Sequence, residues 1–557
     1  MAVLLWGLTS ALLSAEPALR LLIVDQDGSS GAGTHTWSQN GNPDDFRIMT
    51  AGSTVAGYTY TCSTNPDVSY TMEDFILSAD TPDGLYVQAN STLRGYRNSV
   101  TGNATLSQPL WLGYDLTLVD GTENTYEFKP STTVLPESAS LTDFASQKGY
   151  VAVLGLKAKV TTIEELHLGG NARIVHFGGV SEDTVFELAG NIYVEGDNNA
   201  FYGNTIYGTV GDRSLNITAN IYGSADKTLI VTGFSENTSN YLQLSGDNTN
   251  YHGNWDIEGS NFYLANAVNS LGTGDVALNS YQMTNGGDTF TVHSTLIFGE
   301  NADQFDHVAF SNNVTGEGRV FKVGTSTMIM SGEKTYTGDT HIVAGTLELQ
   351  TSLSSETLYV GPAASLNITN VVPVDATTVQ GYTLENLTLY TGSYLNLTIT
   401  DANALPTIIN GNITLTDDST DLKSMFGEGG SQADLLSKLG LSLSSDVLDV
   451  NHKVHITLTY TGLDAEELVL ELFQSEDTQG LLSMQEALEL DQEMLDDGWT
   501  TEVQGNKLVA KKSGKDPDPK PPVPPATAEV PEPGTFVLFL FGIFLLFRRG
   551  NTNGRVK

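Results

Sequence analysis

Few side chains in this sequence combine the residue types and the spacing that a catalytic or metal site requires. His167 follows Glu164 and Glu165, and His176 lies nine residues further on, so these side chains could be drawn as metal ligands. The segment is rich in β-forming residues, and we expect both histidines to be solvated or satisfied locally instead. The chain has no Gly-x-Ser-x-Gly, no His-Glu-x-x-His, no phosphate-binding loop ending in Lys-Ser or Lys-Thr, and no cysteine pair. We therefore expect no catalytic residue and no metal centre of these kinds.

Two acidic stretches are the remaining candidates for calcium. Asp25, Asp27 and Gly28 resemble the opening of a calcium loop, but the later Glu of an EF-hand is missing. Asp417 and Asp418, with Asp421, are typical of a turn. We expect no cofactor, and Ca²⁺ is the one ion that these carboxylates would take.

The strongly acidic balance of the chain limits its partners. The chain has 66 Asp and Glu against 26 Lys and Arg, which leaves a net charge of −40 at pH 7. Such a field repels phosphate, so we expect no nucleic-acid partner. The charge is typical of a large secreted surface that must stay soluble. Cys62 is the single cysteine, which excludes an intrachain disulfide, and we expect it to be a small buried side chain.

The composition favours many short strands over long helices. Only 17% of the 557 residues are charged and 39% are hydrophobic, while glycine occurs 56 times. Gly, Asn, Thr and Ser mark turns and strands, whereas long helices are rich in Ala, Leu, Glu and Lys. We predict a mainly β protein that gains its stability from repeated packing.

Three segments share one pattern, near residues 194–210, 242–278 and 328–349. In each segment a strand ends at a glycine, a polar turn follows, and a tyrosine then precedes a second glycine. The recurring residues are Gly196, Tyr202 and Gly203 in the first copy, Gly246, Tyr251 and Gly253 in the second, and Gly332, Tyr336, Gly338 and Gly345 in the third.

The pattern predicts one turn of a solenoid per copy. Glycine would supply positive φ at the corners, and Ile342, Leu347 and Leu349 would point inward. The recurring tyrosines would stack as an internal ladder. A single turn cannot bury its own apolar face, so the turns must stack on one another. The alternative is a set of unrelated β-hairpins with similar turn chemistry.

The third copy resembles the autotransporter-associated β-strand repeat. The second copy, with its continuation over 269–278, resembles this repeat more loosely. The resemblance implies a right-handed parallel β-helix of the kind found in passenger regions. Autotransporters end in a membrane β-barrel, whereas this sequence ends in a Pro-rich stretch and an apolar segment, so we expect no self-translocation.

The residue pattern of the chain changes towards both ends. From residue 426 to 512 we predict a small α+β cap, with helices over 433–439 and 482–490 and strands over 455–460 and 507–510. The predicted regions are a weak signal peptide (1–15), a β-rich N-terminal region (16–150), the β-helix (151–425), the cap (426–512), a Pro-rich linker (513–530) and a C-terminal tail (531–557).

The C-terminal tail contains a candidate sorting signal. The motif Pro531, Glu532, Pro533 and Gly534 precedes an apolar run from Thr535 to Phe547, and Arg548 and Arg549 follow at once. The 13-residue run spans only about 20 Å as a helix, which is short for a bilayer core of about 30 Å. We expect a short transmembrane helix with the arginines in the cytoplasm. It would serve either as a permanent anchor or as a temporary anchor that is removed by cleavage.

This arrangement closely resembles the PEP-CTERM sorting tail of Gram-negative bacteria. The resemblance covers only about the last 30 residues, and it implies an exosortase as sorting peptidase and a transient stage in the inner membrane. It implies release towards the cell surface or the extracellular matrix, where exopolysaccharide or host glycans are possible partners.

Two functions of different classes remain open. The first is a non-enzymatic surface protein that serves in adhesion, matrix structure or spacing. The second is a carbohydrate-active enzyme, because parallel β-helices also carry polysaccharide lyases and glycoside hydrolases. Such an enzyme needs carboxylates, usually with Arg or Lys, on one face of adjacent turns. The low Lys and Arg content favours the first function.

Overall fold

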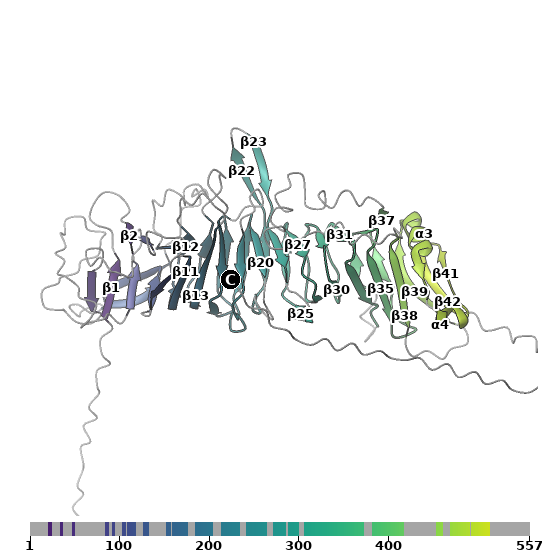
Figure 1. Ribbon diagram of the computed structural model, residues 1–557, viewed down its shortest axis with the longest axis horizontal. Coiled ribbons are helices and arrows are strands. Elements are labelled where there is room, and N and C mark those ends of the chain that lie inside the picture. The colour runs from purple at the N-terminus through teal and green to yellow at the C-terminus, as the bar shows by residue number, and fades with distance from the viewer. Residues whose placement is uncertain are drawn as a thin grey trace, which may run out of the picture. The chain divides into compact units, whose positions relative to one another are not determined.

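The computed structural model describes strands between residues 20 and 132, most of 152–416 and most of 453–512 (Figure 1). The gaps within the last two ranges are 157–158, 177–183, 204–212, 234–240, 265–270, 286–287, 300–305, 373–380, 461–467 and 491. The chain divides into two compact units, Met1–Ser513 and Gly514–Lys557, and the second unit lies outside the described residues. None of the described helices has the length and apolar character needed to cross a bilayer.

Parallel strands stacked along one axis form the body of the first unit, as Figure 1 illustrates from β11 to β38. The largest sheet, sheet A, consists of β1 (Arg20–Val24), β3 (Arg47–Thr50), β4 (Gly84–Val87), β6 (Asn103–Leu106), β7 (Leu110–Leu112), β11 (Val160–Leu168), β13 (Thr184–Val194), β15 (Arg213–Ile217), β16 (Asn220–Gly223), β18 (Leu242–Leu244), β20 (Asn261–Leu264), β24 (Thr295–Phe298), β27 (Arg319–Lys322), β29 (Thr340–Ile342), β31 (Thr357–Val360), β34 (Asn386–Tyr390) and β37 (Ile413–Thr416).

Three smaller sheets complete the other faces. Sheet B contains β2 (Thr34–Thr36), β5 (Thr92–Arg94), β10 (Val153–Leu156), β12 (Arg173–His176), β14 (Asn199–Tyr202), β17 (Thr228–Thr232), β19 (Asn254–Glu258), β21 (Val276–Asn279) and β26 (Val314–Gly316). Sheet E contains β25 (His307–Phe310), β28 (Thr327–Met330), β30 (Thr346–Leu349), β32 (Ser365–Thr369), β35 (Tyr394–Ile399), β38 (His455–Tyr460) and β40 (Leu488–Glu489). Sheet F contains β33 (Thr383–Leu384), β36 (Thr407–Ile409), β39 (Leu468–Ser475), β42 (Lys507–Lys512) and β41 (Trp499–Gln504).

Successive turns visit the faces in a fixed order. One turn runs through β27, β28 and Lys334, and the next runs through β29, β30 and Leu353. The two turns pair in parallel on each face, as β27 with β29, β28 with β30, and Lys334 with Leu353. This register is that of a parallel β-helix, which confirms the predicted architecture. Its handedness stays a prediction.

The core is a set of columns of inward side chains. Alternation along each short strand turns every second residue inward, where it meets the equivalent residue of the next turn. Ile342, Leu347 and Leu349 are fully buried, as predicted from the third repeat. Ile342 lies between Lys322 and Val360 in one such column.

Two antiparallel hairpins interrupt the regular turns. They pair β22 (Tyr281–Asn285) with β23 (Asp288–Val292), and β8 (Tyr114–Leu118) with β9 (Tyr126–Pro130). The β22–β23 hairpin stands out from the stack of strands in Figure 1. Both are insertions that leave the order of the parallel strands unchanged.

The region predicted as a cap begins as solenoid. β38 pairs in parallel with β35, and β40 pairs in parallel with β38, so sheet E continues past residue 425. Parallel stacking ends in sheet F, where β42 lies antiparallel between β39 and β41. The predicted strands over 455–460 and 507–510 correspond to β38 and β42.

The helix predicted over 482–490 begins four residues earlier and ends three residues earlier in the structure, as α3 (Thr478–Ala487). Asp477 caps its N-terminus by accepting a hydrogen bond from the backbone N–H of Gly480. The helix stops because Leu488 is extended and pairs with Ile456 of β38. A second short helix, α4 (Gln492–Asp496), follows. The helix predicted over 433–439 lies outside the described residues.

Candidate functional site

The predicted tyrosines are buried, but they do not form one ladder. Tyr202, Tyr251 and Tyr336 are at most 2% exposed. Tyr202 pairs with Thr232 in sheet B, whereas Tyr251 forms a bridge with Gly223 at the end of β16. The ladder prediction is therefore wrong, because the register places Tyr202 and Tyr251 in different columns. Each ring finds its own partner, as Tyr251 does with Trp255 (ring centroids 5.2 Å apart).

The predicted corner glycines serve mainly to let neighbouring turns approach. Only Gly332 and Gly345 among them have the predicted positive φ, at 74° and 68°. A Cβ at Gly196, Gly246 or Gly338 would lie within 2.2 Å of a carbonyl oxygen of the preceding turn. The expectation of positive φ is thus wrong at those three positions, and backbone contact explains the glycine instead.

The other predicted glycines also lie at turn-to-turn contacts. A Cβ at Gly253 would meet the Tyr251 ring at 2.7 Å and the carbonyl of Lys227 at 2.8 Å. Gly203 donates its N–H to the carbonyl of Thr232 (2.9 Å).

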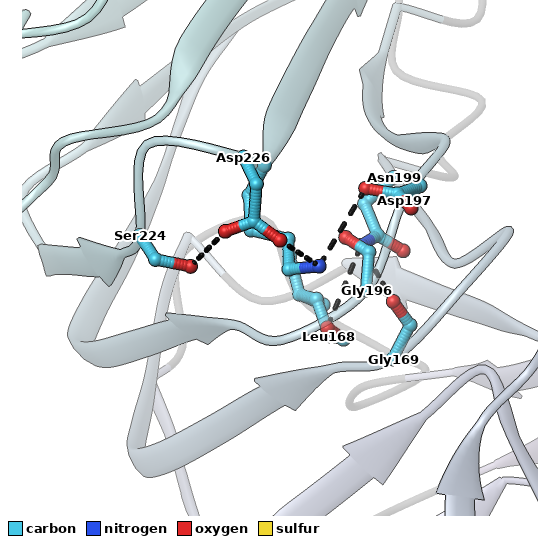
Figure 2. Close-up of polar contacts among 8 residues, drawn as sticks. Leu168, Gly169, Gly196, Asp197, Asn199, Ser224 and Asp226 are labelled. Atoms are coloured by element: carbon cyan, nitrogen blue, oxygen red, sulfur yellow. Dashed lines mark hydrogen bonds and ion pairs between the residues drawn. The ribbon is translucent and has the colours of Figure 1, made fainter.

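Buried polar side chains hold the corners between faces, and the sequence-based prediction did not include them. The Asn199 amide donates to the carbonyls of Gly169 and Gly196, both at 2.9 Å, and its oxygen accepts from the N–H of Ala172 (3.0 Å). Figure 2 shows Asn199 beside these two glycines. This contact satisfies backbone groups that a sharp corner would otherwise leave unpaired.

A lysine occupies the corresponding corner of the third repeat. The Lys334 ammonium donates to the carbonyls of Asn312 (2.7 Å) and Ser331, and it lies 4.5 Å from the centre of the Phe310 ring. Burial lowers the pKa of Lys334 to about 8. Its position two residues after Gly332 matches that of buried Asn248 after Gly246, which is the signal that could have identified it.

A partly exposed ion pair lies at the corner of Asn199 on the following turn of the solenoid. Asp226 accepts from Ser224 (2.5 Å) and pairs with Lys227 (2.8 Å), while Asp197 of the preceding turn lies 3.9 Å from the same ammonium. Figure 2 shows Asp226 and Asp197 facing one another across this corner. Hydrogen bonds from Lys227 and Ser224 hold the pKa of Asp226 down at about 2. The arrangement is a surface turn, with the small energetic weight that exposed pairs have.

His167 belongs to a stack of rings on the outer face of sheet A. It lies between Trp111 (5.1 Å) and Tyr193 (4.9 Å), and Tyr222 continues the stack at 5.0 Å. His176, by contrast, ends β12 in sheet B, so the two histidines of the metal hypothesis lie on different faces. Among the described residues no group of three His, Cys, Asp or Glu is placed to bind a metal ion.

His167 and Tyr114 both contact the carboxylate of Glu195. His167 Nδ1 lies 3.1 Å from Glu195 Oε1, and the Tyr114 hydroxyl donates to Oε2. Burial raises the pKa of Glu195, but the hydrogen bonds from His167 and Tyr114 outweigh it and leave the pKa below its ordinary value. Burial raises the pKa of Tyr114. The cluster is a hydrogen-bonded cross-link between turns.

Asp256 and Glu258 stand together on the outer face of sheet B, because Trp255 and Ile257 between them fill the core. Burial, and then the charge of Asp256, raises the pKa of Glu258 to about 7, against the opposing charge of Arg173. Burial also raises the pKa of Asp256. A carboxyl that stays partly protonated at neutral pH is the group that general acid catalysis uses.

Arg173 supplies positive charge to the same face. It is 3% exposed and donates to the carbonyls of Ala172 (3.0 Å) and Asn198. Burial lowers its pKa to about 10, and the charge of Glu258 acts in the opposite direction. Alternation along β19 could have identified the carboxylates, whereas only the register places Arg173 on their face.

Several predicted residues lie outside the described part of the chain. These are Cys62, the acidic stretches at 25–28 and 417–421, the sorting motif Pro531, Glu532, Pro533 and Gly534, the apolar run from Thr535 to Phe547, and the basic stop Arg548 and Arg549.

One family model matches the chain. It is described as the passenger-associated-transport-repeat and covers residues 320–349, which is the third repeat with the strand before it. The match confirms an autotransporter-type repeat at this place. No curated protein and no solved structure matches the chain.

Proposed function

We propose that this protein is an exported, non-enzymatic β-solenoid of the cell surface or extracellular matrix, with a role in adhesion, matrix structure or spacing. The observation that carries the proposal is the passenger-type repeat at 320–349, which coincides with stacked turns of a parallel β-helix. Repeats of this kind belong to passengers that are exported, and the acidic surface suits a protein that stays soluble outside the cell.

The solenoid has the internal bonding that a surface scaffold needs without disulfides. Each turn hydrogen-bonds to the next through its strands, and Asn199 and Lys334 satisfy the corners. Stability in such an array is a sum of contacts between neighbouring turns, so length can be gained without a larger core.

The proposed sorting signal is the C-terminal tail. In this proposal an exosortase reads Pro531, Glu532 and Pro533 while the apolar run holds the chain in the inner membrane, and cleavage releases the body outward. Mass spectrometry of the C-terminus of surface-extracted protein tests it. We expect a C-terminus near the motif, whereas an intact Arg548–Arg549 end on surface protein contradicts sorting and leaves a plain anchor.

A matched pair of variants separates the motif from the membrane segment. Glu532→Ala should leave the full-length protein in the inner-membrane fraction. Glu529→Ala, three residues upstream, should be sorted normally. Equal surface yield of both variants and the natural sequence argues against recognition of the motif.

A second candidate function rests on Asp256 and Glu258. Their place on one outer face, with Arg173 and the raised pKa of Glu258, supports a carbohydrate-active enzyme with Glu258 as general acid. Glu258→Gln should then reduce release of reducing sugar by about a hundredfold or more, while Glu348→Gln on sheet E should not. Absence of turnover by the natural sequence on neutral and acidic glycans removes this candidate.

A further inference from the structure

Three neighbouring strands of sheet E repeat one outward pattern. Ser365–Thr369, Tyr394–Thr398 and His455–Thr459 each alternate buried aliphatic residues with outward polar ones. The register places Asn367, Asn396 and Thr457 in one outer column and Thr369, Thr398 and Thr459 in the next. We call these six residues the hydroxyl–amide face.

The hydroxyl–amide face is open to solvent. Thr369 and Thr459 are exposed, and the four other side chains are partly exposed. Neighbouring strands lie roughly 4.8 Å apart and alternate residues about 7 Å apart, so the six side chains form a flat grid of about 10 by 7 Å. A flat grid of this kind meets an extended polymer more readily than a compact ligand.

Hydrogen bonds between the side chains fix the central column. Thr457 Oγ1 donates to Asn396 Oδ1 (2.8 Å), and Asn396 Nδ2 donates to Asn367 Oδ1 (2.8 Å). The amides are therefore held in one orientation before any ligand arrives. Such preorganisation reduces the entropy that binding would otherwise cost.

An aromatic pair borders the grid on one side. The Tyr394 and His455 rings stack with centroids 5.0 Å apart and planes 15° apart. Tyr394 begins the strand that carries Asn396, and 38% of its surface is exposed. Exposed aromatic surface beside hydroxyl and amide groups can pack against the C–H face of a sugar ring while the polar groups bond its hydroxyls.

Charge decides which polymer fits this face. None of its six residues is ionisable, although the chain carries a net charge of −40 and Glu348 and Glu489 occupy the same column on either side. A polyanion would be repelled by the surrounding carboxylates within a screening length of about 8 Å. A polycation would be drawn to the whole surface rather than to this grid. Only an uncharged polymer would select it.

We infer that the hydroxyl–amide face with Tyr394 binds an uncharged, linear polysaccharide laid across β32, β35 and β38. The inference deepens the proposed surface function, on which it rests, by assigning a ligand class and a site. Hydroxyls along the polymer would exchange hydrogen bonds with Asn367, Asn396 and Thr457, and one sugar ring would pack on Tyr394.

Titration calorimetry of the purified full chain tests the inference. The probes are cellohexaose and mannohexaose, with oligogalacturonate as an acidic comparison. We expect at least one neutral hexasaccharide to bind with a Kd of about 1 mM or tighter, and Tyr394→Ala and Asn396→Asp each to weaken that binding by about tenfold or more. Oligogalacturonate should bind more weakly than either.

The chain offers close controls for both substitutions. Tyr222 stacks on Tyr193 at 5.0 Å and 15° on sheet A, so Tyr222→Ala removes a ring of the same geometry elsewhere. Asn216 accepts from Ser245 (2.8 Å) as Asn396 accepts from Thr457, so Asn216→Asp adds the same charge elsewhere. Neither control should change the affinity, and the Tm of every variant shows whether it is folded.

Several outcomes overturn the inference. The inference is wrong if neither neutral hexasaccharide binds at about 10 mM. It is also wrong if the control variants weaken the affinity as much as the test variants, or if oligogalacturonate binds more tightly than the neutral probes. If Asn396→Asp abolishes a concentration-dependent self-association in sedimentation and leaves sugar binding intact, the face is a contact between copies instead. Failure of surface sorting with intact glycan binding contradicts only the proposed function, so the two results are distinguishable.

Discussion

The outer faces of sheets A and E use similar ring stacks in opposite surroundings. On sheet A, His341 lies between Phe321 (4.4 Å) and Tyr359 (4.7 Å), and both Phe321 and His341 are 2% exposed. On sheet E, Tyr394 stacks on His455 at 5.0 Å but keeps 38% of its surface exposed. The comparison shows that the strand register brings the rings together, whereas the covering of the face decides whether the stack is buried or stays open to solvent.

The largest expected effect concerns the buried histidine. Burial, and then the charge of Arg319, lowers the pKa of His341 to about 3. The pKa of His341 in the folded state is below that of the unfolded chain. The contribution of neutral His341 to stability is therefore fully present above pH 6.5 and is lost as the pH falls towards 3. The loss over this window is on the order of 5 kcal/mol.

His341→Phe should remove this dependence. The measurement is the Tm of the natural sequence and of the variant between pH 7 and pH 4, where the difference between them should change in favour of the variant as acid is added. Parallel curves for the two proteins contradict a neutral, buried His341.

The next effect compares one ring from each face. Phe321→Ala should lower the free energy of unfolding by about 3 to 5 kcal/mol, because a fully buried ring leaves a cavity. Tyr394→Ala should cost at most about 1 kcal/mol, because its ring is already partly in water. Urea unfolding of both variants measures the difference, and a similar cost for both rings means that sheet E is not open.

The smallest effect concerns the hydrogen-bonded column of Thr457, Asn396 and Asn367 on sheet E. Thr457→Val keeps the shape of the side chain but removes the hydrogen bond to Asn396 Oδ1, which should cost about 1 kcal/mol. Thr459→Val, in the next column of the same strand, is the control and should cost less. A loss in the free energy of unfolding as large as that of Phe321→Ala would mean that this hydrogen-bonded column lies in the core.

Inward positions were predictable from the sequence and outward partners were not. Alternation identified Ile342, Leu347 and Leu349 correctly, because every second residue of a strand points to the core of a solenoid whatever covers the other side. The tyrosine ladder failed because a shared sequence pattern does not fix the strand pairing. The register pairs Tyr202 with Thr232 and Tyr251 with Gly223, so the two tyrosines lie in different columns.

The sequence by itself determined a β-rich repeat protein with a strong acidic surface, since composition, glycine spacing and alternation are local properties of the chain. It also held the signal for the hydroxyl–amide face, in the shared pattern of 365–369, 394–398 and 455–459. Only the tertiary structure brought these three segments together, across 56 residues that separate the second from the third. It also decided that this face is open while the stack of Phe321 and His341 on sheet A is buried, because alternation along a strand does not fix what covers its outer side.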